Sequence, residues 1–129
     1  MSSTEIFAIV FALATLVVVT FQLALAFGAP WGALAMGGAF PGRFPPAMRV
    51  AAAVQAVILG VAALAILSVA GVYAAPWGAT PTWIAWTVAA LLGVGLVMNL
   101  ITPSKGERRI WVPVITVMLV CCIVVAALS

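Results

Sequence analysis

The sequence predicts an all-α protein, a bundle of four transmembrane helices that forms one domain over residues 1–129. Hydrophobic residues make up 67% of the chain and charged residues only 5%, whereas a soluble domain carries about 25% charged residues. The hydrophobic residues gather in segments near 20 residues long, enough to span a bilayer as helices, at positions 6–27, 50–73, 82–101 and 110–128. In lipid, backbone polar groups must be paired inside each segment, so these segments are expected to form helices.

The first helix is expected over residues 6–27. Ser2 and Glu5 have the spacing of a capping box, in which the serine caps the helix and the glutamate reaches back to it. A cleaved signal peptide is the less favoured alternative, because residues 1–5 contain an acid and no lysine or arginine.

The second helix is expected over residues 47–73, after Pro45 and Pro46, and the third over residues 81–101, where Thr80 provides a cap and Pro81 a first-turn proline. Both helices carry a small residue at every fourth position, which lets membrane helices approach closely. These residues are Ala52, Ala56 and Gly60 in one helix and Ala85, Ala89 and Gly93 in the other. The pattern predicts that the two helices pack together and that Gly93→Leu separates them.

The fourth helix is expected over residues 105–128. Ser104 and Glu107 repeat the capping-box spacing. Pro113 lies about two turns into the helix, where it frees the carbonyl of Arg109, so we expect a helix kink. The kink either widens one end of the bundle or is a passive bend. The adjacent Cys121 and Cys122 lack metal-ligand spacing, so we expect them to pack inside the helix.

The positive charges predict the orientation of the chain. All five cations fall in or beside the first and third connections: Arg43, Arg49, Lys105, Arg108 and Arg109. The positive-inside rule makes these connections cytoplasmic and both termini external, N-out and C-out. We expect the five side chains to contact lipid headgroups. Net charge is only +3, which gives no basis for nucleic-acid binding. Trp31 and Trp111 are expected at the inner membrane boundary.

Three amides are expected to share one layer in the cytoplasmic third of the bilayer: Gln22, Gln55 and Asn99. An unpaired amide is expensive in hydrocarbon, so these side chains are expected to meet each other or a wet cavity. An interhelical hydrogen-bond clasp is the favoured interpretation, and a ligand or water site is the alternative.

The first connection, about residues 28–45, is long and contains five glycines together with several large apolar side chains. We expect it to lie among the lipid headgroups or to fold back beneath the bundle. A phosphate-binding loop is not expected, because no Gly-Lys-Ser/Thr follows the glycines.

Two stretches carry a family resemblance. One runs from Gly28-Ala29-Pro30-Trp31-Gly32 to Met36-Gly37-Gly38, with Pro45 and Arg49 after it. The other is Asn99-x-x-Thr102-Pro103-Ser104-Lys105-x-Glu107-Arg108-x-x-Trp111-x-Pro113. Together they resemble a group of small four-helix integral membrane proteins of bacteria that have no assigned activity. The resemblance implies the bacterial cell membrane as location and adds no mechanism.

The chemistry of the chain favours a non-enzymatic role. There is no histidine, one tyrosine and two acids, so few groups can move protons or attack a substrate. We expect no enzyme activity, no catalytic or metal site and no cofactor. The leading hypothesis is an accessory, assembly or interaction component that forms a homo-oligomer or binds a larger membrane protein. The alternative is an oligomeric channel or transporter of a small solute.

Overall fold

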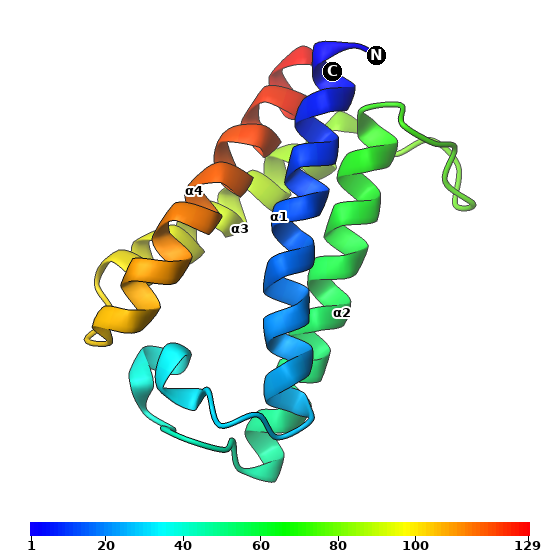
Figure 1. The fold of residues 1–129 in the computed structure, drawn as a ribbon. Coiled ribbons are helices and arrows are strands. Elements are labelled where there is room, and N and C mark those ends of the chain that lie inside the picture. The colour runs from blue at the N-terminus through cyan, green and yellow to red at the C-terminus, as the bar shows by residue number, and fades with distance from the viewer.

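The computed structural model describes residues 1–129 as four helices that run up and down in an antiparallel bundle (Figure 1). Their bounds are α1 Ser3–Ala26, α2 Pro46–Val69, α3 Thr82–Leu100 and α4 Lys105–Leu128. Each helix is long and apolar enough to cross a membrane. The protein is therefore an all-α, multi-pass membrane protein, as the sequence predicts.

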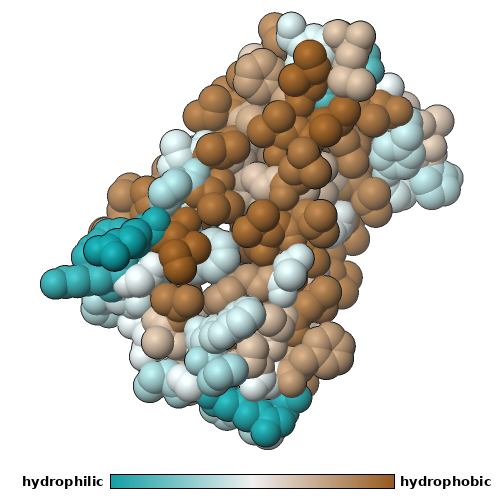
Figure 2. Space-filling model, viewed as in Figure 1, coloured by the Kyte–Doolittle hydropathy of each residue, from teal (hydrophilic) through white to brown (hydrophobic).

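The connections divide the molecule into two ends. Loop 1 (residues 27–45) and loop 3 (residues 101–104) lie at one end, together with all five cations, and we call this the basic end. Loop 2 (residues 70–81) and both chain termini lie at the other, the terminal end (Figure 1). Figure 2 shows hydrophilic surface at the basic end and a broad hydrophobic belt along the helices.

Local sequence signals account for most helix boundaries. The Ser2–Glu5 capping box is present, with the Ser2 hydroxyl accepting from the Glu5 N–H at 3.2 Å. Pro46 occupies the first turn of α2, where its missing N–H has no helical partner to lose. Helix α2 ends at Val69, not at residue 73, because the chain turns at Gly71 with φ +80°.

The predicted Thr80 cap is wrong. Pro81 is the cap residue of α3, and no side chain caps this helix. The Thr80 hydroxyl instead accepts from Trp77 Nε1 at 2.8 Å and donates to the Ser68 hydroxyl at 2.9 Å. Thr80 therefore ties loop 2 to the end of α2, and its oxygen, which a cap would use as an acceptor, accepts from the Trp77 indole instead.

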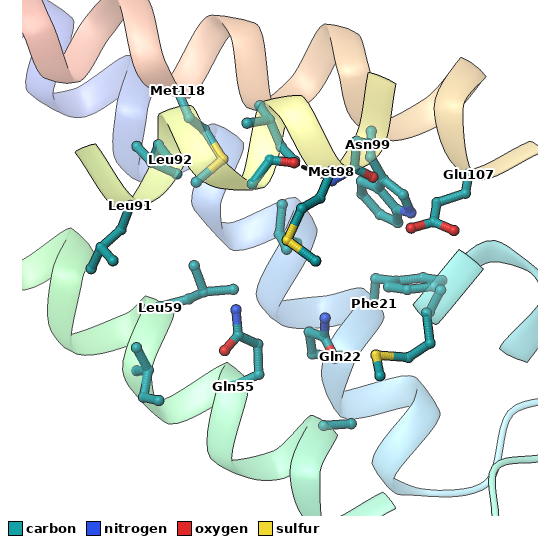
Figure 3. A pocket seen from close by; sticks show the side chains of 18 of the residues that line it. Phe21, Gln22, Gln55, Leu59, Leu91, Leu92, Met98, Asn99, Glu107 and Met118 are labelled. Carbon is teal, nitrogen blue, oxygen red and sulfur yellow. Dashed lines mark hydrogen bonds between the residues drawn. The ribbon is translucent and has the colours of Figure 1, made fainter. Parts of the chain in front are cut away.

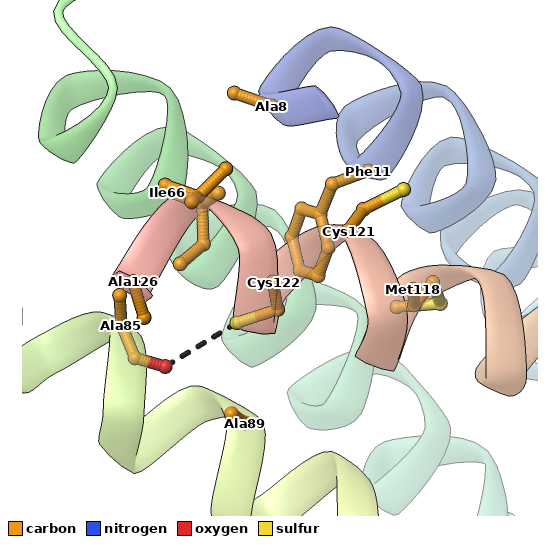
Figure 4. Close-up of a cluster of buried hydrophobic side chains, with 10 residues drawn as sticks. Ala8, Phe11, Ile66, Ala85, Ala89, Met118, Cys121, Cys122 and Ala126 are labelled. Carbon is orange, nitrogen blue, oxygen red and sulfur yellow. Dashed lines mark hydrogen bonds between the residues drawn. The ribbon is translucent and has the colours of Figure 1, made fainter. Parts of the chain in front are cut away.

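All four helices pack together in the half of the bundle near the terminal end. Their buried core joins α1, α2 and α3 to the last three turns of α4, and Phe11, Ile66, Met118 and Val125 are its largest members (Figure 4). Cys121 and Cys122 are unpaired and buried in this core, as predicted. The Cys122 thiol donates to the Ala85 carbonyl at 3.3 Å, a bond drawn in Figure 4.

A second core holds the basic end, and α3 contributes no buried residue to it. It joins Phe21 and Leu25 of α1 to Ala52 of α2 and Trp111 of α4, and the remaining buried members, Ala35 and Phe44, belong to loop 1. Figure 1 shows the α1–α2 pair and the α3–α4 pair diverging toward this end, with loop 1 between them. Loop 1 thus folds back beneath the bundle because its apolar side chains fill the gap.

The predicted seam between α2 and α3 is wrong. These two helices make fewer contacts than the α1–α2, α3–α4 and α1–α4 pairs. A Cβ added at Gly60 or Gly93 would meet no atom within 4 Å. The buried alanines of α3, Ala85 and Ala89, pack in the terminal core with residues of α4. Small residues permit close approach but do not determine which helix packs against them. Here the neighbouring helices are α1 and α4.

Candidate functional site

A pocket of about 630 Å³ occupies the space between the two diverging helix pairs (Figure 3). Twenty of its 25 lining residues are hydrophobic. Loop 1 closes the pocket at the basic end, where Leu34, Ala35, Met36 and Phe44 line it. Its volume lies within the range of about 300–1,000 Å³ that is usual for small-molecule sites.

The pocket has an open side between α2 and α3. Four of its lining residues on these two helices are large, apolar and more than half exposed: Ile58, Leu91, Val94 and Met98. In a bilayer, such residues face lipid tails. The opening therefore leads sideways into the hydrocarbon region and not straight into water.

The structure brings the three predicted amides to this one pocket. Gln22, Gln55 and Asn99 all line it, from α1, α2 and α3 respectively, and Figure 3 shows Gln22 and Gln55 side by side. The favoured clasp is not formed. Asn99 Nδ2 donates to the Gly95 carbonyl of its own helix at 2.8 Å, and no hydrogen bond joins one amide to another. Gln22 and Gln55 lie on the α1–α2 pair and Asn99 on α3, and all three line the same pocket.

Glu107 also lines the pocket and is 92% buried, with an exposed fraction of 8%. Of the two hydrogen bonds expected for a capping box between Ser104 and Glu107, only one forms. The Ser104 hydroxyl does accept from the Glu107 N–H at 3.2 Å. The Glu107 carboxylate, however, turns away from Ser104 and accepts from the Gly37 N–H at 2.9 Å and the Thr102 hydroxyl at 3.0 Å. A glutamate that normally finishes a helix cap here holds a loop instead.

Three hydrogen bonds attach loop 1 to the start of α4, and we call this set the loop latch. The Glu107 carboxylate binds the Gly37 N–H, as described above. The Ser104 hydroxyl donates to the Ala33 carbonyl at 2.8 Å, and Trp111 Nε1 donates to the Leu34 carbonyl at 2.9 Å. The latch holds residues 33–37 of loop 1 across the end of the pocket.

The backbone of loop 1 allows this path. Gly37 and Gly38 have φ values of +68° and +77°, which glycine adopts readily. Met36 has φ +53°, the only positive φ of a non-glycine residue in the chain, and its side chain lines the pocket. Such a conformation stores strain that the surroundings must hold in place. The hydrogen bond from the Gly37 N–H to the Glu107 carboxylate fixes the residue next to Met36 and so stabilises this conformation.

Trp111 was expected at the inner membrane boundary, and its depth in the bilayer stays a prediction. Its ring is buried and lies 4.6 Å from the ring of Phe21, measured between centroids. The indole N–H reaches a loop carbonyl, so the ring has both an apolar and a polar partner inside the protein. Trp31 is half-exposed, and its ring stacks on that of Phe21 with the two centroids 6.3 Å apart.

The five cations lie outside the pocket. Arg49 Nε donates to the Ala26 carbonyl at 2.8 Å, which satisfies a free carbonyl at the end of α1. The Arg108 guanidinium donates to the Thr102 carbonyl at 3.2 Å. The side chains of Arg43, Lys105 and Arg109 are exposed and make no hydrogen bond within the chain. Contact of the five cations with lipid headgroups stays a prediction, and Arg49 and Arg108 also bind backbone carbonyls of the chain.

Pro113 lies inside α4 without ending it, since the helix runs unbroken from Lys105 to Leu128. The proline lacks the N–H that would otherwise bind the Arg109 carbonyl. Its predicted kink remains a prediction.

The loop latch was missed from the sequence for a physical reason. Glu107 and Trp111 bind backbone groups of loop 1, and backbone groups leave no mark in the sequence. Their partners also lie far away, 70 residues for Gly37 and 77 for Leu34. The one available signal was a glutamate and a tryptophan near apolar membrane segments, each of which needs a partner when buried.

This chain matches none of the protein-family models, curated proteins or solved structures with which it was compared.

Proposed function

We propose that this protein is a non-enzymatic membrane component that takes a lipid-like molecule from the bilayer into the pocket beneath loop 1. The main support is the distribution of polar residues in the pocket, which is apolar along the helices and polar at the basic end. The polar residues that line it are Gln22, Gln55, Asn99 and Glu107. That distribution is complementary to an amphiphile, with its tail between the helix pairs and its head near loop 1.

The proposed location is the bacterial cell membrane, with the basic end in the cytoplasm. This orientation rests on the placement of all five cations at the basic end and none at the terminal end. The amphiphile then enters from the inner leaflet, through the opening between α2 and α3. The buried core at the terminal end keeps the pocket from continuing across the bundle.

Two glycines of α3 supply a matched test. A Cβ added at either Gly95 or Gly93 meets no atom within 4 Å, but only Gly95 lines the pocket. We therefore expect Gly95→Leu to fill pocket volume and Gly93→Leu to add the same atoms outside it. The probe is a monoacylglycerol carrying a photoreactive diazirine, added to the protein in lipid nanodiscs.

We expect photolabelling of the wild type on peptides that line the pocket. Labelling of Gly95→Leu falls at least several-fold, and that of Gly93→Leu is unchanged. Equal labelling of all three proteins, or labelling spread evenly over the lipid-facing surface, contradicts the proposal.

A second candidate is that α2 and α3 receive a helix of another subunit, either a second copy of this chain or a larger membrane protein. The observation that favours it is a second hollow in the same gap nearer the terminal end, about 280 Å³, lined by Val61, Ala65 and Ile84 among others. With Gly60 and Gly93 facing open space, a helix could approach closely along the whole gap.

The same glycines separate the two candidates. If a helix occupies the gap, Gly60→Leu and Gly93→Leu abolish crosslinking to the neighbouring subunit in native membranes, while monoacylglycerol labelling stays low in all variants. Recovery of uncrosslinked monomer from the wild type contradicts this second candidate. Transport would require the pocket to open at the terminal end, and proteoliposome flux tests that directly.

A further inference from the structure

We infer that the guest of this pocket carries a positive charge on its head and that the Glu107 carboxylate binds it. This inference rests on the proposed function and narrows it to lipophilic cations, such as long-chain amines, quaternary ammonium compounds and phosphonium compounds. It follows from the absence of a positively charged partner for the Glu107 carboxylate within the chain.

Glu107 is the only ionisable residue that lines the pocket, and no lysine or arginine is among the lining residues. Its two hydrogen bonds come from uncharged donors, the Gly37 N–H and the Thr102 hydroxyl. The neighbouring Arg108 guanidinium donates to a carbonyl instead. A carboxylate that is 92% buried thus has no cationic partner within the chain, although buried charges in proteins are normally paired.

The two oxygens of this carboxylate are used unequally. Both hydrogen bonds end on Oε2, and none ends on Oε1. Every fully buried side-chain oxygen in the chain has a hydrogen-bond partner. Oε1 has none, so this atom must be accessible. Figure 3 shows the carboxylate at the pocket end where Phe21 and Asn99 lie. Oε1 is the free acceptor at the polar end of the pocket.

The surroundings suit a cation with an apolar body. The rings of Phe21 and Trp111 line the same end of the pocket, and aromatic faces attract cations. Asn99 and the two glutamines add carbonyl oxygens. Twenty hydrophobic lining residues would accommodate the rest of the molecule. An anionic head would instead meet Glu107 with like charge.

The test uses two probes of nearly equal size and opposite charge, tetraphenylphosphonium and tetraphenylborate. Binding of each to protein in nanodiscs is measured by equilibrium dialysis, with empty nanodiscs as the blank for partition into lipid. We expect the wild type to retain the cation above the blank and the anion not at all. Equal retention of both ions by the wild type overturns the inference without any variant.

Glu107→Gln is the matched variant. A glutamine keeps one oxygen to accept from Gly37 and Thr102, so the loop latch is retained, and only the charge is lost. We expect this variant to bind tetraphenylphosphonium at least tenfold more weakly, about 1.4 kcal/mol. We expect its thermal unfolding to match the wild type, because the hydrogen bonds to Gly37 and Thr102 are kept.

The outcomes distinguish the inference from the proposed function. If Gly95→Leu blocks both probes while Glu107→Gln binds the phosphonium ion as tightly as the wild type, the pocket binds amphiphiles but the charge assignment is wrong. If Gly95→Leu changes neither probe, the pocket is not the binding site and both fall. If Glu107→Gln loses phosphonium binding but also unfolds at a lower temperature than the wild type, Glu107 serves the shape of the pocket, which likewise overturns the charge assignment.

Discussion

At the scale of single residues, the indole N–H of Trp111 is expected to hold loop 1 in place. It donates to the Leu34 carbonyl at 2.9 Å from a buried ring. Trp111→Phe keeps most of the ring and removes this donor, so the partly buried Leu34 carbonyl loses its partner. We expect a loss of about 1–3 kcal/mol in stability and faster hydrogen exchange at residues 33–38, measured by mass spectrometry in nanodiscs.

Trp31→Phe is the control for this variant. Trp31 also lies beside Phe21, but its ring is half-exposed and its indole N–H makes no hydrogen bond within the chain. The change should leave exchange in residues 33–38 at the wild-type rate. Equal acceleration in both variants would show that ring bulk, and not the Leu34 bond, holds the loop.

Gly32 is expected to be the least replaceable glycine of loop 1. A Cβ at this position would lie 1.8 Å from the Phe40 carbonyl oxygen and 2.7 Å from that of Gly42. Both obstacles are backbone atoms, which cannot move aside as a side chain would. We expect Gly32→Ala to shift the loop and lower stability by about 1–3 kcal/mol, read as a lower thermal midpoint in detergent.

The comparison is Gly42→Ala, where a Cβ meets nothing within 4 Å but φ is +78°. Backbone strain alone accounts for about 1–2 kcal/mol there. A Gly32→Ala protein as stable as the wild type would mean that loop 1 does not pack as described.

Residue-scale prediction from the sequence succeeded where the partner is local. Ser2 and Glu5 lie three positions apart, and their capping box is present. Ser104 likewise caps α4. It failed for Glu107, because the same spacing fits a capping box while Gly37, 70 residues earlier, offers a competing N–H. Spacing describes what a side chain can reach locally and says nothing of distant backbone groups.

At the scale of elements, hydropathy predicted the four helices because lipid requires each segment to pair its own backbone. Pairing of the helices was not predictable in the same way. The small-residue repeat of α2 and α3 identifies smooth faces, yet Ala52 is buried with Phe21 of α1 and Ala89 with the terminal core. The small residues show which helix faces can pack closely. Which helices then pair depends on the bulky side chains of α1, α4 and loop 1 that contact those faces.

This difference gives a test of helix pairing within α3. Ala89 is 7% exposed and packed in the terminal core, so Ala89→Leu overfills it. We expect a loss of about 1–3 kcal/mol. Gly93→Leu, one turn later, extends into open space and should leave the thermal midpoint in detergent within error of the wild type. The reverse order of stability would restore the α2–α3 seam.

At the scale of the whole molecule, the proposed uptake depends on which leaflet the pocket opens to. The hydrophobic belt alone does not distinguish the two sides of the membrane. The asymmetry lies in the five cations, all at the basic end, and this is the quantity that membrane insertion responds to. The pocket, the amides and Glu107 share that end, so the orientation of the chain decides the proposed route of entry.

Two exposed alanines report the orientation, Ala39 in loop 1 and Ala79 in loop 2. Each is replaced by cysteine, and intact spheroplasts of a bacterial host are treated with a membrane-impermeant maleimide. The wild type is the blank, because both native cysteines are buried. We expect Ala79→Cys to be labelled at once and Ala39→Cys only after the membrane is permeabilised. The opposite pattern would place Glu107 at the outer leaflet, where the pocket would take its amphiphile from outside the cell, and the inner-leaflet route would have to be abandoned while the pocket chemistry stands.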